Sequence, residues 1–66
     1  MLIYVNGEPR EVADAIPMVT LIESLALTGR RIAVEVNAEL VPRSRFDQHV
    51  LRPGDRVEVI HAVGGG

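Results

Sequence analysis

The sequence ends in Val63-Gly64-Gly65-Gly66, and its last three residues carry no side chain that could obstruct the terminal carboxylate. Glycine lacks a Cβ, so this segment can pass close to another protein's backbone. Three extended residues span about 10 Å, at roughly 3.3–3.6 Å each, which is enough to enter a narrow channel. One interpretation is a frayed terminus or a linker. The other is a delivery arm, in which Val63, Gly64 and Gly65 thread into a partner's active site and Gly66 carries the chemistry.

The chemistry available to Gly66 is that of a carboxyl carbon. A terminal carboxyl has an ordinary pKa of about 3.5, so it is ionised and unreactive at neutral pH. A partner must therefore convert it into an acyl donor before anything can be transferred. The chain has no cysteine, so it cannot hold sulfur as a persulfide of its own. It also has no lysine, so an activated carboxyl group could not form lysine-linked chains with its own copies.

The two histidines suggest weaker alternatives. His61 lies close to the terminal segment and could act as a general base, but on an alternating strand we expect a surface or partly buried packing residue. His49 lies two residues after Asp47, which could indicate a metal site or a catalytic pair. The sequence offers no third ligand beside them, so we predict no metal site.

A docking surface for a partner would be an exposed apolar patch beside the terminal segment. Outward-facing residues of the last strand and its neighbours are the candidates, but the sequence does not assign their register. Arg43 and Arg45 either contact acidic residues of a partner or are solvated surface arginines. Glu58 is interpreted as a residue of the sheet face, with partner contact as the alternative.

The composition fits one small domain of 66 residues with no disulfide, no cysteine-based zinc site and no iron–sulfur cluster. Such a chain buries only about 60% of its unfolded surface, so its mainly aliphatic core must stabilise it. The seven basic residues are scattered arginines, which argues against nucleic-acid binding. No apolar run approaches membrane-spanning length, and the start lacks the features of a signal peptide. We expect a cytoplasmic protein without a membrane partner.

The first predicted unit is a β-hairpin. Leu2–Val5 is β-branched, aromatic and apolar, and Asn6-Gly7 is the strongest two-residue hairpin signal. The return strand is predicted over Glu8–Val12. Because Pro9 cannot donate a backbone hydrogen bond, this strand should lie at a sheet edge.

A helix should follow. Its apolar face has the spacing i, i+3, i+4, i+7 in Met18, Leu21, Ile22 and Leu25. Pro17 suits the first helical turn, and Gly29 is the predicted residue just beyond the helix end. Asp14 is the nearest candidate for the N-cap.

Three further strands are predicted. Residues 32–37 alternate with period two, and Leu40-Val41 forms a brief strand that Pro42 ends. Residues 42–50 form a turn or 3₁₀ segment anchored by Phe46. Arg52-Pro53-Gly54-Asp55 suits a type II turn. The last strand, over residues 56–63, is the most apolar late segment, so we place it in the centre of the sheet.

The order of these elements predicts an α+β fold, in which a mixed sheet of four to five strands carries one main helix packed across it by a crossover. This is the β-grasp arrangement. We expect a β-grasp domain over residues 1–63 and a flexible glycine tail over residues 64–66.

Several segments resemble one family. Ile3-Tyr4-Val5-Asn6-Gly7 is similar to its opening strand and turn, and Ala33-Val34-Glu35-Val36-Asn37 to its middle strand. Val41-Pro42-Arg43-Ser44-Arg45-Phe46 matches a V-P-R-x-x-W/F segment, and Leu51 to Val59 is similar to the late turn and strand. Together with a terminal Gly-Gly pair, these segments resemble the ubiquitin-like sulfur carriers of the ThiS type.

The resemblance implies a sulfur carrier of thiamine (thiazole) biosynthesis that is a co-substrate and not an enzyme. It implies that a ThiF-type adenylating enzyme, using ATP and Mg²⁺, activates Gly66. A cysteine persulfide or another sulfur donor then leaves a thiocarboxylate, which a ThiG-type thiazole synthase consumes. No cofactor is expected on this chain itself. The alternatives are the small subunit of molybdopterin synthase, a ubiquitin-like protein modifier, and a structural β-grasp module.

Overall fold

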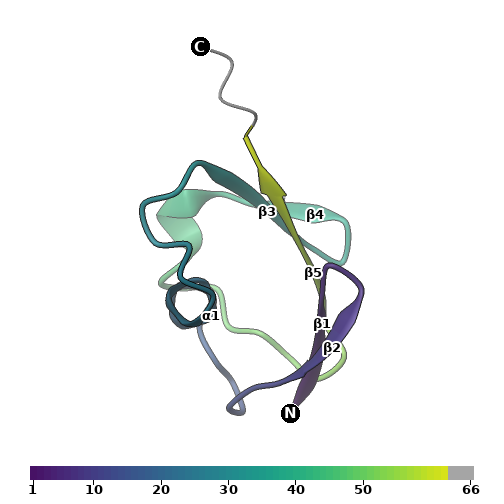
Figure 1. The fold of residues 1–66 in the computed structure, drawn as a ribbon. Coiled ribbons are helices and arrows are strands. Elements are labelled where there is room, and N and C mark those ends of the chain that lie inside the picture. Colours follow the sequence, from purple (N-terminus) through teal and green to yellow (C-terminus); the bar gives the residue numbers. More distant parts are fainter. Residues whose placement is uncertain (63–66) are drawn as a thin grey trace.

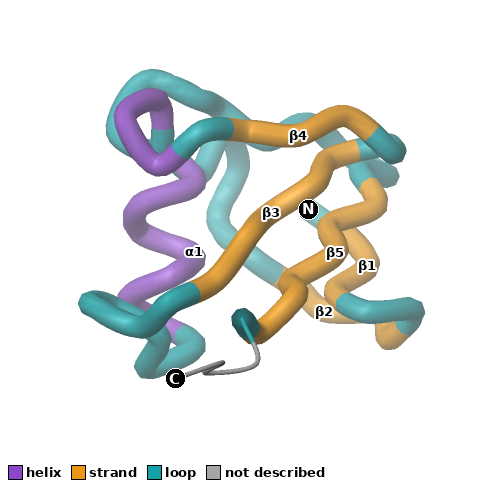
Figure 2. Tube along the Cα trace, turned by 90° about the horizontal axis from the view of Figure 1, so that it is seen from above, coloured by secondary structure: helices purple, strands orange, loops and turns teal. Residues whose placement is uncertain are grey.

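The computed structural model describes residues 1–62, which form one five-stranded mixed sheet with a single α-helix on one face (Figures 1 and 2). The elements are β1 (Leu2–Val5), β2 (Glu8–Glu11), α1 (Met18–Ser24), β3 (Ile32–Val36), β4 (Glu39–Val41), the 3₁₀ turn η1 (Arg43–Arg45) and β5 (Arg56–His61). The strand order is β2-β1-β5-β3-β4, with β1 and β5 parallel. This is the β-grasp fold that the sequence predicts, with five strands.

The β1–β2 hairpin forms where Asn6-Gly7 predicts it. Asn6 and Gly7 have φ angles of 51° and 83°, the positive values that a type I′ turn requires. Pro9 pairs with Tyr4 on the edge strand β2, where the missing donor costs no ladder hydrogen bond. The prediction is confirmed, although β2 ends at Glu11, one residue before the expected end.

The helix α1 presents the expected face, with Met18, Leu21 and Ile22 buried against the sheet. Both predicted ends are wrong. Pro17 has extended dihedral angles and is the N-cap itself, not the first helical residue, and no side chain caps it.

At the C-terminal end of α1, the first residue with positive φ is Ala26 (59°), not Gly29. The Ala26 N–H donates to Glu23 O at 3.0 Å and the Leu27 N–H to Ile22 O at 3.1 Å, which completes a Schellman motif three residues early. Leu27 packs against the core, and this contact accompanies the early end. Gly29, with φ of 78°, serves the next turn.

Asp14 does not cap the helix, because its carboxylate lies 3.2 Å from the Met1 ammonium. The same ammonium lies 3.4 Å from Glu11 and donates to Val12 O at 2.6 Å. The hydrogen bond that the Met1 ammonium donates to Asp14 is the largest cause that raises the pKa of this ammonium; Glu11 adds to the rise, while burial opposes it. These contacts fix the start of β1 beside the end of β2.

The remaining elements predicted for the C-terminal half are confirmed, although β3 ends at Val36, one residue before the expected end, and β4 begins at Glu39, one residue earlier than expected. Strand β4 ends before Pro42, a 3₁₀ turn follows, and Phe46 is buried as the apolar anchor of that segment. Gly54 has φ of 82° in the turn that Asp55 N–H closes on Arg52 O at 3.1 Å. Strand β5 is central, although it ends at His61, and Val63 lies outside the described residues.

The core lies between α1 and the inner sheet face and is aliphatic except for one aromatic ring. Its six most deeply buried side chains are Ile3, Met18, Leu21, Val34, Leu51 and Val57. Buried residues come from α1, from every strand of the sheet except β2, and from the loop before β5. Since the helix and this loop pack against the same sheet face, they fix the position of β5. No helix within residues 1–62 is long and apolar enough to cross a membrane.

Candidate functional site

Strand β5 is paired on both sides at its start and, on the β3 side, as far as Ala62, the residue before Val63. Strand β5 pairs in parallel with β1 and in antiparallel with β3, the latter from Val36↔Val57 to Ile32↔His61. One residue further, the Ala62 N–H donates to Arg31 O at 2.9 Å. The segment that carries the predicted chemistry therefore follows directly from the central strand.

Two asparagines bracket β5 from opposite neighbours. Asn6, just after β1, accepts a hydrogen bond from the Val59 N–H through its Oδ1 at 2.8 Å. Asn37, just after β3, accepts one from the Arg56 N–H at 3.0 Å and donates through Nδ2 to Asp55 at 3.0 Å. Both residues have positive φ, a conformation that asparagine tolerates better than most residues. Each side chain continues the ladder of β5 where the neighbouring strand has turned away.

Val63, Gly64, Gly65 and Gly66, the residues predicted to thread into a partner and to carry sulfur, lie outside the described residues. Their roles stay predictions, as does the division into residues 1–63 and 64–66.

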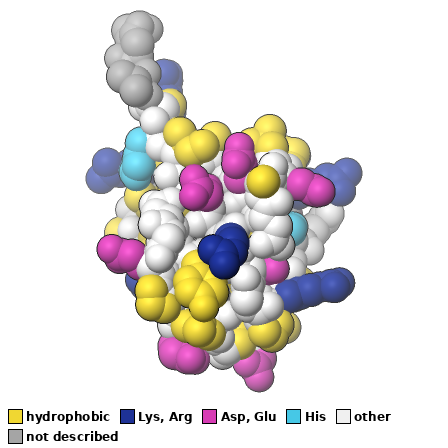
Figure 3. Space-filling view, turned by 90° about the vertical axis from the view of Figure 1, so that its right-hand side faces the viewer, with side chains coloured by type: hydrophobic (Ala, Val, Ile, Leu, Met, Phe, Trp, Pro, Cys, Tyr) yellow, Lys and Arg dark blue, Asp and Glu magenta, His cyan; other side chains and the backbone are white. Residues whose placement is uncertain are grey.

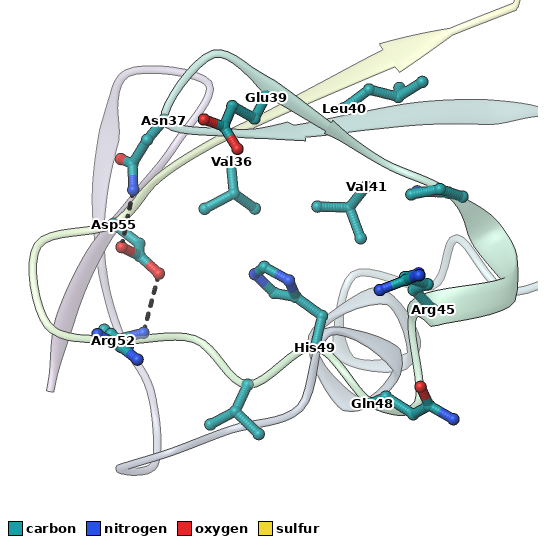
Figure 4. A pocket seen from close by; sticks show the side chains of 12 residues that line it. Val36, Asn37, Glu39, Leu40, Val41, Arg45, Gln48, His49, Arg52 and Asp55 are labelled. Atoms are coloured by element: carbon teal, nitrogen blue, oxygen red, sulfur yellow. Dashed lines mark hydrogen bonds between the residues drawn. The ribbon is translucent and has the colours of Figure 1, made fainter.

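The two histidines lie apart. His61 is exposed at the end of β5, in agreement with a surface position. His49 is half-buried and points into a hollow of about 930 Å³ between β4 and the loop that precedes β5 (Figure 4). Asp47 lines a different hollow, so the structure does not bring the His49–Asp47 pair together.

The hollow around His49 is lined by apolar and charged side chains in about equal measure. Arg45 and Arg52 line it, and Asp55 accepts hydrogen bonds from the Arg52 N–H and from Asn37 (Figure 4). It adjoins the start of β5, whereas Val63 follows the other end of that strand. Among residues 1–62, no group of three His, Asp or Glu side chains could hold a metal ion.

The two arginines of the V-P-R segment have different environments. The Arg43 guanidinium donates to Arg30 O, which ties η1 to the loop before β3. Arg43 also lines a shallow hollow with Ala62 and Ile60, at the end of β5. Arg45 lies on the far side, in the hollow of His49. Of the two arginines, Arg43 is therefore the one next to the terminal segment, where it shares the hollow with Arg31.

The structure assigns the register that the sequence left open. Val57 and Val59 of β5 face the core, so Glu58 and Ile60 face outward, on the side of the sheet away from α1. On this face, acidic side chains lie among hydrophobic ones (Figure 3). Leu2, Leu40 and Ile60 are the large apolar residues exposed on this face, with 39%, 64% and 48% of their surface accessible. Glu58 is thus a residue of the sheet face, as expected.

Two features of the site were not predicted from the sequence. The asparagine brackets join residues up to 53 positions apart, and only the turn tendency of Asn6-Gly7 was visible locally. Glu58 and Glu35 lie directly opposite each other on β5 and β3. The alternation within each strand indicated which residues share a face of the sheet. It did not indicate which residue of β3 lies opposite Glu58.

The comparisons with known proteins agree with this fold. A thiazole synthase of Paramagnetospirillum magneticum is 35% identical over 66 residues; the match covers 100% of this chain and only 20% of that protein. The sulfur carrier protein ThiS of Escherichia coli is 27% identical over the full length of both. The crystal structure of ThiS from Geobacter metallireducens superposes with a TM-score of 0.87 at 33% identity and covers 100% of both chains. The model of the ThiS family matches residues 3–66. With nearly its whole length matched, the chain belongs to the ThiS family.

Proposed function

We propose that this chain is the sulfur carrier of thiamine (thiazole) biosynthesis and that it is a co-substrate of other enzymes, not a catalyst. The observation that carries the proposal is the family match, which extends through Gly66. The relative of equal length in Escherichia coli is named a sulfur carrier protein.

The proposed chemistry takes place at the carbonyl carbon of Gly66. A ThiF-type adenylating enzyme, with ATP and Mg²⁺, joins the carboxylate to AMP and releases pyrophosphate. A sulfur nucleophile attacks the acyl carbon, AMP leaves, and a thiocarboxylate remains. Hydrosulfide does this directly, whereas a persulfide donor also needs a thiol to reduce its S–S bond. Gly64 and Gly65 keep the approach to this carbon free of side chains.

The fold supports this role through β5. A co-substrate must present its terminal segment to more than one enzyme, so the base of that segment should keep its position. The central place of β5 and the hydrogen bond from Ala62 to Arg31 fulfil this condition.

Thiazole synthase is the proposed acceptor of the sulfur. In two curated relatives named thiazole synthase, the segment similar to this chain covers 20% of the protein. A carrier segment and its acceptor in one polypeptide would meet at high effective concentration. The separate chain would have to recognise the same enzyme through a surface.

The test is the intact mass of the chain after incubation with an adenylating enzyme, ATP, Mg²⁺ and sulfide. We expect a gain equal to the difference between a sulfur and an oxygen atom, located on the C-terminal peptide. A variant without Gly66 and a variant with one added C-terminal residue should gain nothing while they remain folded.

Other outcomes would contradict the proposal. Conjugates to other proteins through Gly66, without the gain in mass, would assign a protein modifier. Sulfur loading followed by transfer to molybdopterin precursors instead of thiazole would assign the other carrier pathway. Growth without thiamine of a strain whose only carrier lacks Gly66 would also refute it.

A further inference from the structure

The outer sheet face carries two glutamates in an unfavourable position. Glu35 of β3 and Glu58 of β5 are directly opposite each other in the antiparallel ladder. Side chains so placed have Cβ atoms about 4.5–5.5 Å apart, and like charges there destabilise the sheet. Within residues 1–62, neither carboxylate forms a hydrogen bond or an ion pair.

The arginine on the outward face of β5 is engaged elsewhere. Arg56, two residues before Glu58, lies over the ring of Tyr4, with its guanidinium carbon 5.3 Å from the ring centroid. Tyr4 and Arg56 are themselves neighbours in the β1–β5 ladder. The chain has no lysine that could reach the glutamates instead.

Apolar side chains surround the two carboxylates. Ile60 pairs with Ala33 on one side of the glutamate pair, and Leu40 lies opposite Glu35 on the other. Ile60 and Leu40 are 48% and 64% exposed, so together they place apolar surface beside the two carboxylates. An apolar border around two like charges fits a long basic side chain, whose stem covers apolar surface while its charge meets the acids.

The position of this face links it to the terminal segment. Ile60 is two residues before Ala62, so a protein that receives residues 63–66 must lie next to this face. Taken together, we propose that Glu35 and Glu58 form a socket for a lysine or arginine of thiazole synthase. This rests on the proposed function. The partner's cation relieves a repulsion that the free chain carries, so recognition is coupled to removal of strain.

The test compares binding and stability in the same variants. Glu35→Arg and Glu58→Arg each place an arginine opposite the remaining glutamate, so both should unfold at higher urea concentration than wild type. Both should nevertheless bind the thiazole synthase of the same genome about tenfold or more weakly, because a partner cation now meets a cation. Glu23→Arg, at an exposed glutamate in the last turn of α1, is the matched control. It should leave binding unchanged, although a cation at this end of the helix can raise stability slightly.

Each result decides the question. If Glu35→Arg and Glu58→Arg are more stable than wild type but bind more weakly, the socket is supported, because misfolding cannot explain a loss of binding in a more stable variant. Equal binding of all variants overturns the socket but leaves the proposed function intact, since wild type still binds. Variants that lose only sulfur loading, or only self-association of the chain, would assign this face to the adenylating enzyme or to a second copy and overturn the proposal. If wild type loads sulfur but does not bind thiazole synthase, the acceptor is wrong and the socket falls with it.

Discussion

The bracket that Asn6 forms on β5 gives the sharpest test of how the sheet is stabilised. Its Oδ1 accepts the hydrogen bond from the partly buried Val59 N–H at 2.8 Å, while its own N–H donates to Val57 O at 2.8 Å. Substitution of Asn6 by a residue without a side-chain acceptor removes the first bond and leaves the second. The backbone at this position has φ of 51°, so the substitute must also tolerate a left-handed conformation.

Three substitutions separate these effects. Asn6→Gly keeps the backbone conformation but leaves the Val59 N–H without its partner, which costs about 1–2 kcal/mol for a partly buried donor. Asn6→Ala adds the left-handed strain of an L-residue, about 1 kcal/mol or more. Asn6→Asp keeps an acceptor oxygen and should lie closest to wild type. The expected order of stability is therefore Asp, then Gly, then Ala.

Thermal unfolding followed by circular dichroism measures this order. In a domain of this size, 1 kcal/mol shifts Tm by about 4–8 °C, so Asn6→Gly should lower it by about 4–16 °C. Glycine also adds freedom to the unfolded chain, so amide exchange must locate the loss. The Val59 amide should exchange faster relative to the Ala62 amide, whose bond to Arg31 is unaffected. Unchanged Tm and unchanged Val59 exchange in Asn6→Gly would refute the bracket.

The remaining predictions concern turns, core and pH. Ala38→Gly and Ala26→Gly should each raise the free energy of unfolding by about 0.5–1 kcal/mol in urea titrations, because their φ angles of 68° and 59° strain an L-residue. Leu51→Ala should lower it by about 2–5 kcal/mol, since Leu51 is 1% exposed, and loss of NMR signal dispersion would report this. The raised pKa of the Met1 ammonium means that its ionised form stabilises the folded state. This stabilisation is fully present at pH values below the ordinary pKa of the group and is lost as the pH rises through its pKa in the folded state. Unfolding midpoints should fall in that alkaline range, and by less in Asp14→Asn; equal pH profiles would contradict this.

Local patterns were sufficient for most of the elements. A period of two placed β3 and β5, and Asn6-Gly7 and Pro53-Gly54 placed the turns, because these conformations depend on residues within a few positions. The end of α1 was not predictable this way. Glycine at position 29 marked a stop, but the chain turns at Ala26, against its residue preference and beside Leu27, which packs on the core.

The candidate surface was less predictable than the fold, since it depends on residues far apart in sequence. The alternation of β5 told which residues share a face, but the neighbours of Glu58 follow from the pairing of β5 with β3. That register is set by the parallel β1–β5 contact and the crossover through α1, and no local pattern encodes it.

The alternation of β5 places the residues that stabilise the core on one face of the strand and the residues proposed to bind a partner on the other. Val57 and Val59 face the core, so changes there should alter stability first, and binding only through it. Glu58 and Ile60 face outward, where a residue chosen for stability alone would not be a glutamate opposite a glutamate. If selection had acted on the free fold only, Gln or Thr at position 58 would serve better. The repulsion is thus explained by a partner that cancels it, and substitutions at position 58 should move stability and binding in opposite directions.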